Sequence, residues 1–205
     1  MIRIEGLSKS YENIQLYKDF DIEIEEGKTT VLLGASGSGK TTFIRMLLGI
    51  ESYEKGNIIG LENKNISVVF QEDRLIPWLN VSKNIEIVLK AYLEPDAIQN
   101  RIEEILKLVE LLEYKDCEIN KLSGGMKRRV ALARALAYDG ELLIMDEPFK
   151  GQDYALKLRL LERIKILIIK EKRTVVFVTH DMEEASLLGD VLLKFEERPV
   201  KFYKI

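Results

Sequence analysis

Hydrophobic and polar positions follow two periods along this chain. Ile2 and Ile4, and later Phe20, Ile22 and Ile24, alternate with polar residues, which predicts strands with one solvated face. The other apolar runs are continuous, as is typical of strands buried on both faces, and they span residues 31–33, 66–70, 142–145, 175–178 and 191–193.

Segments whose apolar residues have helical spacing lie between these runs. Ile98, Ile102, Ile105, Val109 and Leu112 recur at intervals of four, three, four and three residues, so they share one face of an amphipathic helix. Strands that alternate with helices favour an α/β fold built on a mostly parallel sheet, here with an N-terminal antiparallel β subdomain.

Two further helices are expected, over residues 126–138 and 155–170. Residues 82–120 carry no strand pattern, so a helical lobe is predicted over approximately 82–138. The whole chain, 1–205, is expected to form one domain with this lobe projecting from it.

Composition narrows the classes of function. The net charge is −3, whereas a nucleic-acid-binding surface calls for a strong basic excess, so no nucleic-acid partner is expected. The single cysteine, Cys117, fits a reducing compartment. The N-terminus has no apolar signal core and no apolar run approaches the ~20 residues of a membrane span. We therefore expect a soluble protein, or one that reaches a membrane through a partner.

A glycine-rich loop carries the strongest chemical signal. Gly34-Ala35-Ser36-Gly37-Ser38-Gly39-Lys40-Thr41 follows a predicted strand and matches the P-loop pattern. Backbone N–H groups of such a loop converge on phosphates, Lys40 adds positive charge, and the Thr41 hydroxyl is offered to Mg²⁺. The predicted nucleotide-binding residues of this segment are Gly34, Ala35, Ser36, Gly37, Ser38, Gly39, Lys40, Thr41 and Thr42.

Two adjacent acids end the apolar run 142–145. Ligands of open α/β sheets bind at the carboxyl ends of the strands, so both acids are placed to act on a phosphate ligand. Asp146 is predicted to hold Mg²⁺, and Glu147 to polarise the attacking water.

A third motif suggests a family. Leu122-Ser123-Gly124-Gly125-Met126 resembles the signature that separates ABC ATPases from other P-loop proteins. Ser123 is of a type that caps helices, and the glycines leave N–H groups open to an anion. The resemblance extends over nearly the whole chain and implies the ATPase subunit of a membrane transporter, with ATP and Mg²⁺ as ligands.

The resemblance also assigns roles to single residues. It implies that Tyr11 stacks on adenine, that Gln71 contacts Mg²⁺ and links to the helical lobe, and that His180 contacts the γ-phosphate. The implied catalytic set is Glu147, His180, Gln71 and Lys40, and the implied metal set is Thr41, Gln71 and Asp146. A core or strand position remains the alternative for Tyr11, and a purely structural role remains the alternative for His180.

The implied assembly has several partners. Two copies would enclose two ATP molecules, each P-loop facing Ser123, Gly124 and Gly125 of the other copy. Integral membrane permease subunits would dock near Leu75–Leu79 on the cytoplasmic face of a membrane, and the full system would include a solute-binding protein. Because the chain ends soon after His180, we expect abbreviated last strands and no C-terminal regulatory domain.

Two details set this chain apart within the family. The loop Phe149-Lys150-Gly151-Gln152-Asp153 keeps the family's aspartate but has Gln152 in place of a leucine, which leaves open how this loop packs across the dimer. The loop after Gln71 contains the pair Pro77-Trp78, which looks like importers of nitrate, sulfonate and taurine.

Other interpretations of the sequence remain. The apolar loop residues Leu75, Ile76, Trp78 and Leu79 either line a docking groove or fold onto the chain's own helical lobe. Exporter and importer subunits share all the motifs above. A switch in protein assembly and an ABC ATPase acting on DNA or ribosomes are the alternatives outside transport.

Overall fold

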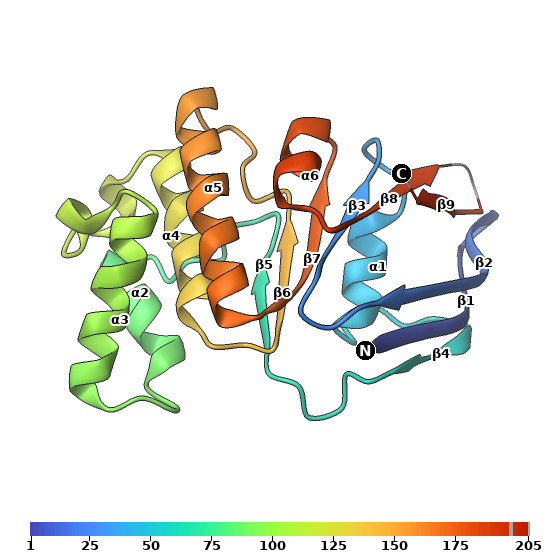
Figure 1. Cartoon of the computed structure of the whole chain (residues 1–205), viewed down its shortest axis with the longest axis horizontal. Coiled ribbons are helices and arrows are strands. Elements are labelled where there is room, and N and C mark those ends of the chain that lie inside the picture. The colour runs from blue at the N-terminus through green and yellow to red at the C-terminus, as the bar shows by residue number, and fades with distance from the viewer. Residues whose placement is uncertain (197–198, 205) are drawn as a thin grey trace.

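A six-stranded sheet lies in the middle of the computed structural model, which describes residues 1–196 and 199–204 (Figure 1). The strand order is β5-β6-β7-β3-β8-β9, and neighbours run parallel except β8 and β9. The strands are β3 (Thr29–Leu33), β5 (Ile66–Val69), β6 (Leu142–Asp146), β7 (Thr174–Thr179), β8 (Val191–Glu196) and β9 (Lys201–Lys204). The predicted α/β class with a mostly parallel sheet is therefore confirmed.

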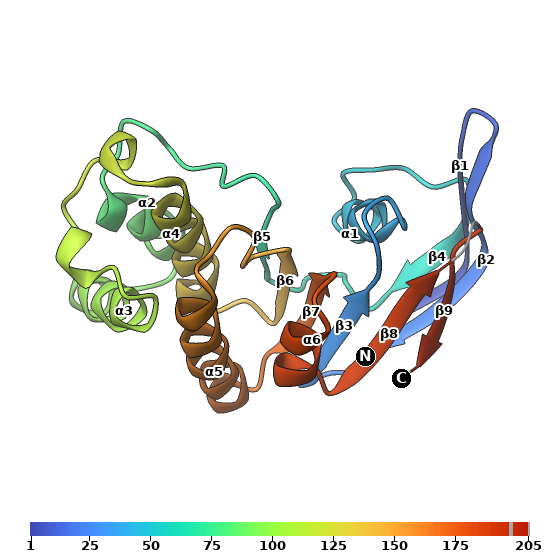
Figure 2. The same cartoon turned by 90° about the horizontal axis from the view of Figure 1, so that it is seen from above.

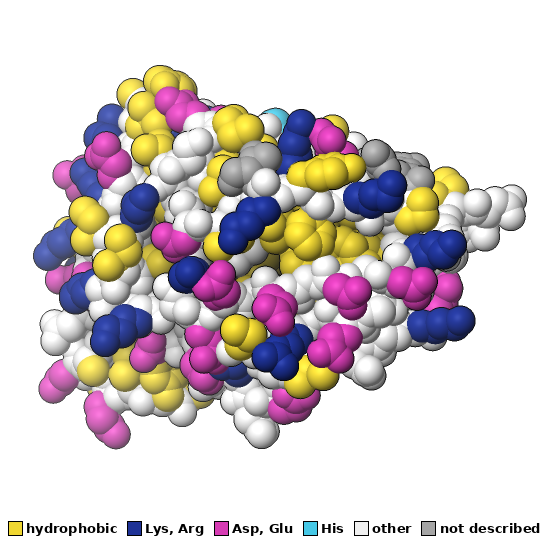
Figure 3. Space-filling model, turned by 45° about the vertical axis from the view of Figure 1, so that its right-hand side comes forward, with side chains coloured by type: hydrophobic (Ala, Val, Ile, Leu, Met, Phe, Trp, Pro, Cys, Tyr) yellow, Lys and Arg dark blue, Asp and Glu magenta, His cyan; other side chains and the backbone are white. Residues whose placement is uncertain are grey.

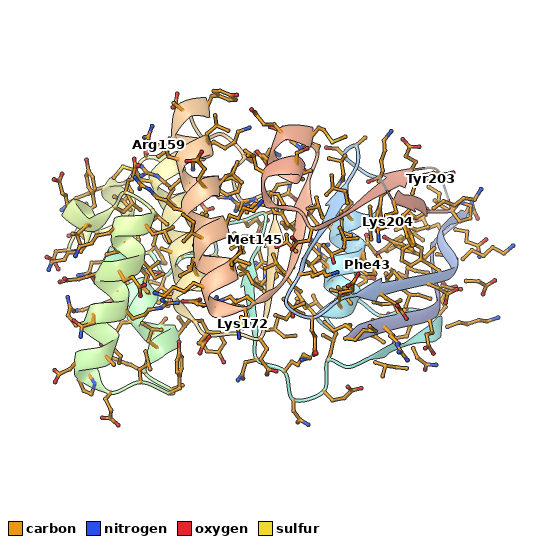
Figure 4. The ribbon with its side chains drawn as sticks, in the orientation of Figure 1. Phe43, Met145, Arg159, Lys172, Tyr203 and Lys204 are labelled. Carbon is orange, nitrogen blue, oxygen red and sulfur yellow. The ribbon has the colours of Figure 1, made fainter. Side chains whose placement is uncertain are left out.

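Both faces of this sheet are buried, which explains its continuous apolar strands. In β3, Val31 and Leu33 join one hydrophobic core while Leu32 joins the other. Figure 4 labels a residue from each core, Met145 on β6 and Phe43 on α1. Because successive side chains of a strand point to opposite faces, consecutive positions in the middle of these strands are apolar.

Helices cover the two faces unequally. Figure 2 shows α1 on one face of the sheet and α5 and α6 on the other, with α2, α3 and α4 gathered beyond the β5 edge. The helices are α1 (Lys40–Leu47), α2 (Val81–Leu89), α3 (Pro95–Leu108), α4 (Gly124–Ala137), α5 (Tyr154–Glu171) and α6 (Met182–Leu188). Short 3-10 turns at Leu112–Tyr114 and Ile119–Lys121 lead from α3 to α4.

A second, antiparallel sheet has the order β2-β1-β4, with β1 at Ile2–Tyr11, β2 at Ile14–Ile24 and β4 at Lys55–Ile59. It packs on α1, where the rings of Phe20 and Phe43 meet edge to face at 5.9 Å. This is the N-terminal antiparallel subdomain that the sequence predicted. It closes the core on the α1 face of the larger sheet.

The strand β4 was not predicted from the sequence. Its first residues, Lys55-Gly56-Asn57, are polar and show no alternation that would indicate a strand. Gly56 has φ of 100°, and a Cβ there would lie 2.6 Å from the Glu5 carbonyl oxygen. The backbones of β1 and β4 thus approach so closely that only glycine fits.

The molecular surface mixes charges of both signs. Figure 3 shows lysines and arginines interspersed with acids over the face that it presents, in keeping with the small net charge of −3. Among residues 1–196 and 199–204, no helix combines the length and the apolar character that crossing a membrane requires.

Candidate functional site

Three segments that carry predicted site residues leave the sheet at the same edge. The strands β3, β6 and β7 are parallel neighbours, so their carboxyl ends lie side by side. The phosphate loop follows β3, Asp146 and Glu147 come at the end of β6, and His180 follows β7. The topology therefore brings together chemistry that lies far apart in the sequence.

The phosphate loop needs glycine at Gly39. This residue has φ of 99°, and a Cβ there would lie 2.9 Å from the Tyr17 hydroxyl and 3.1 Å from Val200. The buried Tyr17 hydroxyl donates to the Gly39 carbonyl at 3.0 Å. Because α1 begins at Lys40, the loop delivers the chain to a helix N-terminus, where N–H groups are available to an anion.

Lys40 folds back over the loop that precedes it. Its Nζ donates to the carbonyl oxygens of Gly34 at 2.7 Å and Ala35 at 2.8 Å, and to Ser38 Oγ at 3.2 Å. Burial lowers the pKa of Lys40, while the nearby carboxylates of Glu147 and Asp146 oppose that shift. The ammonium is thus held against the loop, where a phosphate would compete for its donors.

Thr41 and Asp146 form the next pair. The Thr41 hydroxyl donates to Asp146 Oδ2 at 3.0 Å, and Asp146 is only 4% exposed. Burial raises the pKa of Asp146, and the hydrogen bond from Thr41 partly offsets this.

These two oxygens fit a magnesium ion. Mg²⁺ prefers oxygen donors and usually keeps waters and substrate phosphates beside one or two protein ligands. The described residues contain no cluster of three or more His, Cys, Asp or Glu that could hold a metal. Thr41 and Asp146 would therefore supply a minority of the ligands, as suits an ion that arrives with a nucleotide.

Glu147 lies at the mouth of the site. Its Oε1 is 3.3 Å from His180 Nδ1, and its Oε2 is 3.7 Å from Lys150 Nζ. The Glu147 side chain is 12% exposed and that of His180 is 59% exposed. A cavity of about 270 Å³ adjoins them, also lined by Gln152, Lys157 and Asp181. A carboxylate at such a cavity can accept a proton from a water molecule.

Gln71 is connected to this group through a residue that sequence reasoning missed. The Gln71 carbonyl accepts from Arg128 Nη1 at 3.0 Å, while the residue itself is exposed. Arg128 also bonds to the carbonyls of Asp146 and Glu147. The sequence presents Arg128 only as one of three consecutive basic residues in a helix, so no local signal marks it out.

The motif at Ser123 does not join the phosphate loop of its own chain. Ser123 caps α4 as predicted, since its Oγ accepts from the Met126 N–H at 3.2 Å. Figure 1 shows α4 and α1 on opposite sides of the strands β5, β6 and β7. Ser123 and Gly124 are exposed at the start of α4, away from the phosphate loop of the same chain.

The unusual Gln152 has a defined partner. Its Nε2 donates to the Gly125 carbonyl at 2.9 Å, so the loop after β6 is bonded to the start of α4 in the same chain. The sequence left the packing of this residue open, and a leucine could not make this bond.

Tyr11 and Thr42 lie at the border of the site. Tyr11 ends β1 with 42% of its surface exposed, and Lys9 Nζ lies 4.7 Å from the centre of its ring. Thr42 is half-buried in the first turn of α1. The Tyr11 ring is accessible to a stacking ligand, and its stacking on adenine stays a prediction.

The loop 75–79 agrees only in part with expectation. Trp78 is 82% exposed, whereas Leu75 is partly buried and packs against the core. The groove that Leu75, Ile76, Trp78 and Leu79 were expected to line therefore stays a prediction. The side chain of Asn84 accepts from the Ile76 N–H at 2.8 Å and donates to its carbonyl at 3.1 Å. A cavity of about 270 Å³ lies between β5, α2 and α4, and it is lined by none of these loop residues but by others, among them Val68, Ile87, Val88, Ala91 and Tyr138.

Comparison with known proteins agrees with this geometry. The family model described as "ABC transporter" matches residues 17–150. The chain is 38% identical over 199 residues to the Fe(3+) ions import ATP-binding protein FbpC of Fusobacterium nucleatum, covering 92% of the chain and 54% of the relative. It is 35% identical over 206 residues to the spermidine/putrescine import ATP-binding protein PotA of Aggregatibacter actinomycetemcomitans, covering 95% and 55%. The chain thus spans about half the length of these relatives.

Solved structures share the fold. The dimeric structure of MJ0796, a bacterial ABC transporter cassette, superposes with a TM-score of 0.85 at 28% identity, covering 95% of this chain and 94% of that one. A second structure of MJ0796, in a post-hydrolysis state bound to ADP and Pi, gives the same TM-score, identity and coverage. The agreement includes the antiparallel sheet and the parallel sheet with its helices.

Proposed function

The chain belongs to the ABC transporter family of ATPases, and on that basis we propose that it binds and hydrolyses ATP to drive a solute across a membrane. One observation carries the proposal: at a single sheet edge Thr41 hydrogen-bonds Asp146, and Glu147 contacts His180. These pairs supply, beside a phosphate loop, the metal-binding oxygens and the proton acceptor that phosphoryl transfer to water requires.

Each residue of the site has its own role in binding or hydrolysing ATP. Lys40 would neutralise charge on the β- and γ-phosphates, and Thr41, Asp146 and Gln71 would hold Mg²⁺. Glu147 orients the attacking water and accepts its proton, and His180 contacts the γ-phosphate. Tyr11 stacks on the adenine ring. When bound, Mg²⁺ would supply positive charge against the phosphates.

A second copy completes the site. Because α4 and α1 lie on opposite sides of β5, β6 and β7, Ser123, Gly124 and Gly125 would serve the nucleotide on a partner copy. The dimeric state named for MJ0796 supports this arrangement. The dimer would close on ATP and reopen after hydrolysis.

The membrane partner is the next element of the proposal. The exposed Trp78 and the cavity between β5, α2 and α4 offer apolar anchors for a short helix of a permease subunit. The chain would then act at the cytoplasmic face of the membrane, with a solute-binding protein completing an importer. An exporter subunit and a switch in protein assembly are the alternatives that the same ATP site permits.

The solute is a separate question. The loop with Pro77-Trp78 favours nitrate, sulfonate or taurine, whereas the two relatives are named for Fe(3+) ions and for spermidine and putrescine. The relatives thus support import without supporting that subgroup. ATPase assays with the reconstituted transporter decide between these solute classes. Stimulation by taurine or nitrate supports the assignment from the Pro77-Trp78 loop, and stimulation by polyamine or iron contradicts it.

Hydrolysis is tested with Glu147→Gln. This variant keeps the shape of the side chain and removes the proton acceptor, so ATP should still bind and an ATP-bound dimer should accumulate in light scattering with Mg²⁺. Glu113→Gln, which changes an exposed glutamate in the 3-10 turn that follows α3, serves as the matched control. Turnover of Glu147→Gln at the wild-type rate would assign its role elsewhere. Absence of wild-type turnover, with and without the membrane subunits, would refute the proposed function.

A further inference from the structure

Arg128 is a buried cation that hydrogen-bonds to the backbone at the end of β6 and just after it. Its Nη2 donates to the carbonyl oxygens of Asp146 at 2.9 Å and Glu147 at 2.8 Å, and its Nε donates to that of Pro148 at 3.3 Å. Arg128 is 6% exposed and belongs to α4, so one side chain of that helix holds three successive carbonyls of the catalytic segment.

The other side of the same guanidinium holds the loop of Gln71. Arg128 Nη1 donates to the carbonyls of Phe70 at 2.5 Å and Gln71 at 3.0 Å, and lies 3.2 Å from Asp73 Oδ1. A guanidinium is planar and presents its donors in a fixed fork, so it sets the spacing between the two segments it binds. A lysine ammonium has no planar fork of donors, so it could not set this spacing.

The segment needs this support because Glu147 has an unfavourable backbone. Its φ is 47°, in the left-handed region that side chains with a Cβ rarely adopt. Such a conformation persists only where surrounding contacts enforce it. The Glu147 N–H donates to the Val178 carbonyl at 3.0 Å, and Arg128 holds the carbonyls on either side of that strained residue.

Gln152 makes a second connection between the same two elements. Gln152 follows Pro148 in the same loop, and its Nε2 donates to the Gly125 carbonyl at 2.9 Å. The N-terminal part of α4 is therefore bonded to the segment after β6 at Gly125 and again at Arg128. Movement of the start of α4 must carry the backbone of Glu147 with it.

We propose that Arg128 and Gln152 are positioning residues for hydrolysis, which fix Glu147 relative to α4 and to the loop of Gln71. The inference rests on the proposed function, because Ser123 and Gly124 at the start of α4 would contact the nucleotide of the partner copy. Contact there is transmitted through Arg128 and Gln152 to the chain's own Glu147. The arrangement of each Glu147 thereby depends on whether the other ATP site is filled.

The test compares Arg128→Lys and Gln152→Met with the wild type in one preparation, with kcat, KM for ATP and fluorescent-nucleotide affinity measured separately. Arg128→Lys keeps the charge but loses the fork, and should lower kcat by about tenfold or more with KM and affinity within about twofold. Gln152→Met removes one donor and should lower kcat by about threefold and reduce cooperativity in ATP.

Arg101→Lys is the matched control. Arg101 donates to the carbonyls of Ala137 and Leu136 at the far end of α4, so it reports on general loosening of that helix. Its kcat should stay within about twofold of the wild type.

Several results would overturn the proposal. Wild-type kcat in Arg128→Lys would do so, as would a parallel fall of kcat and nucleotide affinity or an equal loss in Arg101→Lys. If Arg128→Lys does not fold, the Gln152→Met variant decides. Unchanged kcat and unchanged cooperativity in Gln152→Met would then overturn the proposal. A wild-type protein without turnover contradicts the proposed function instead, so the two failures remain distinct.

Discussion

The hydroxyl of Thr41 donates a hydrogen bond to Oδ2 of Asp146 across 3.0 Å, joining the first turn of α1 to the last residue of β6. Asp146 is 4% exposed, and burial raises its pKa above the usual range of an aspartate. An ionised carboxylate at this position therefore opposes folding of the nucleotide-free protein, and a bound cation would relieve that cost.

Asp146→Asn should stabilise the nucleotide-free protein at neutral pH. A carboxyl with a raised pKa in the folded state favours folding only while it is protonated, so its ionisation lowers stability as pH rises from the unfolded pKa through the folded one. Removing the charge should raise Tm at pH 7, and the gain should vanish near pH 3, below the unfolded pKa of about 3.9. Calorimetry beside the exposed control Asp116→Asn checks this, and a lower Tm at pH 7 contradicts it.

Lys40→Ala should abolish ATP hydrolysis and weaken ATP binding by about 2–3 kcal/mol, the scale of a hydrogen bond made by a charged donor. Arg45 lies further along α1 and is exposed, so it cannot replace the lost ammonium. Titration with a fluorescent ATP analogue measures the loss, with Arg45→Ala as control. Wild-type turnover in Lys40→Ala would refute the assignment of the phosphate loop.

His180→Ala should lose most of the ATPase activity while ATP affinity changes little. The ring contacts Glu147 at 3.3 Å and is largely exposed, so its removal leaves the fold intact and takes one partner from the catalytic carboxylate. Steady-state kinetics should show kcat falling about tenfold or more. His180→Gln retains a donor and should recover part of the rate, and full activity in both variants would leave His180 without a catalytic role.

Trp78→Ala should release the chain from its membrane complex without changing ATP affinity. A tryptophan buried at an interface commonly contributes about 2 kcal/mol or more to binding. With 82% of its surface exposed, Trp78 adds little to the fold, so the variant should remain stable. Co-purification with the membrane subunits measures the effect, with Tyr53→Ala before β4 as an exposed aromatic control. Full yield of the Trp78→Ala complex would place the docking site elsewhere.

The sequence predicted those features that depend on neighbouring residues. The phosphate loop, the cap at Ser123 and the buried strand before Asp146 each lie within a few consecutive positions. Parallel pairing then brings the ends of β3, β6 and β7 together without further information. The general fold and the grouping of the site could therefore be derived before any coordinates.

Features that depend on distant backbone atoms could not be predicted. The strand β4 exists because Gly56 lets its backbone approach Glu5, and no alternation marks it. Arg128 binds carbonyls of residues 70–71 and 146–148, and a carbonyl has no side-chain identity to read. The partial burial of Leu75 likewise depends on the core beneath it rather than on its neighbours in the loop.

The exposure of Trp78 gives the molecule an intrinsic optical reporter. It is the single tryptophan of the chain, so all indole fluorescence arises from the loop between β5 and α2. Indole emission shifts to shorter wavelength when water leaves the ring. Assembly on a membrane partner would therefore be visible in the emission spectrum of the unlabelled protein, in real time and at each stage of the ATP cycle.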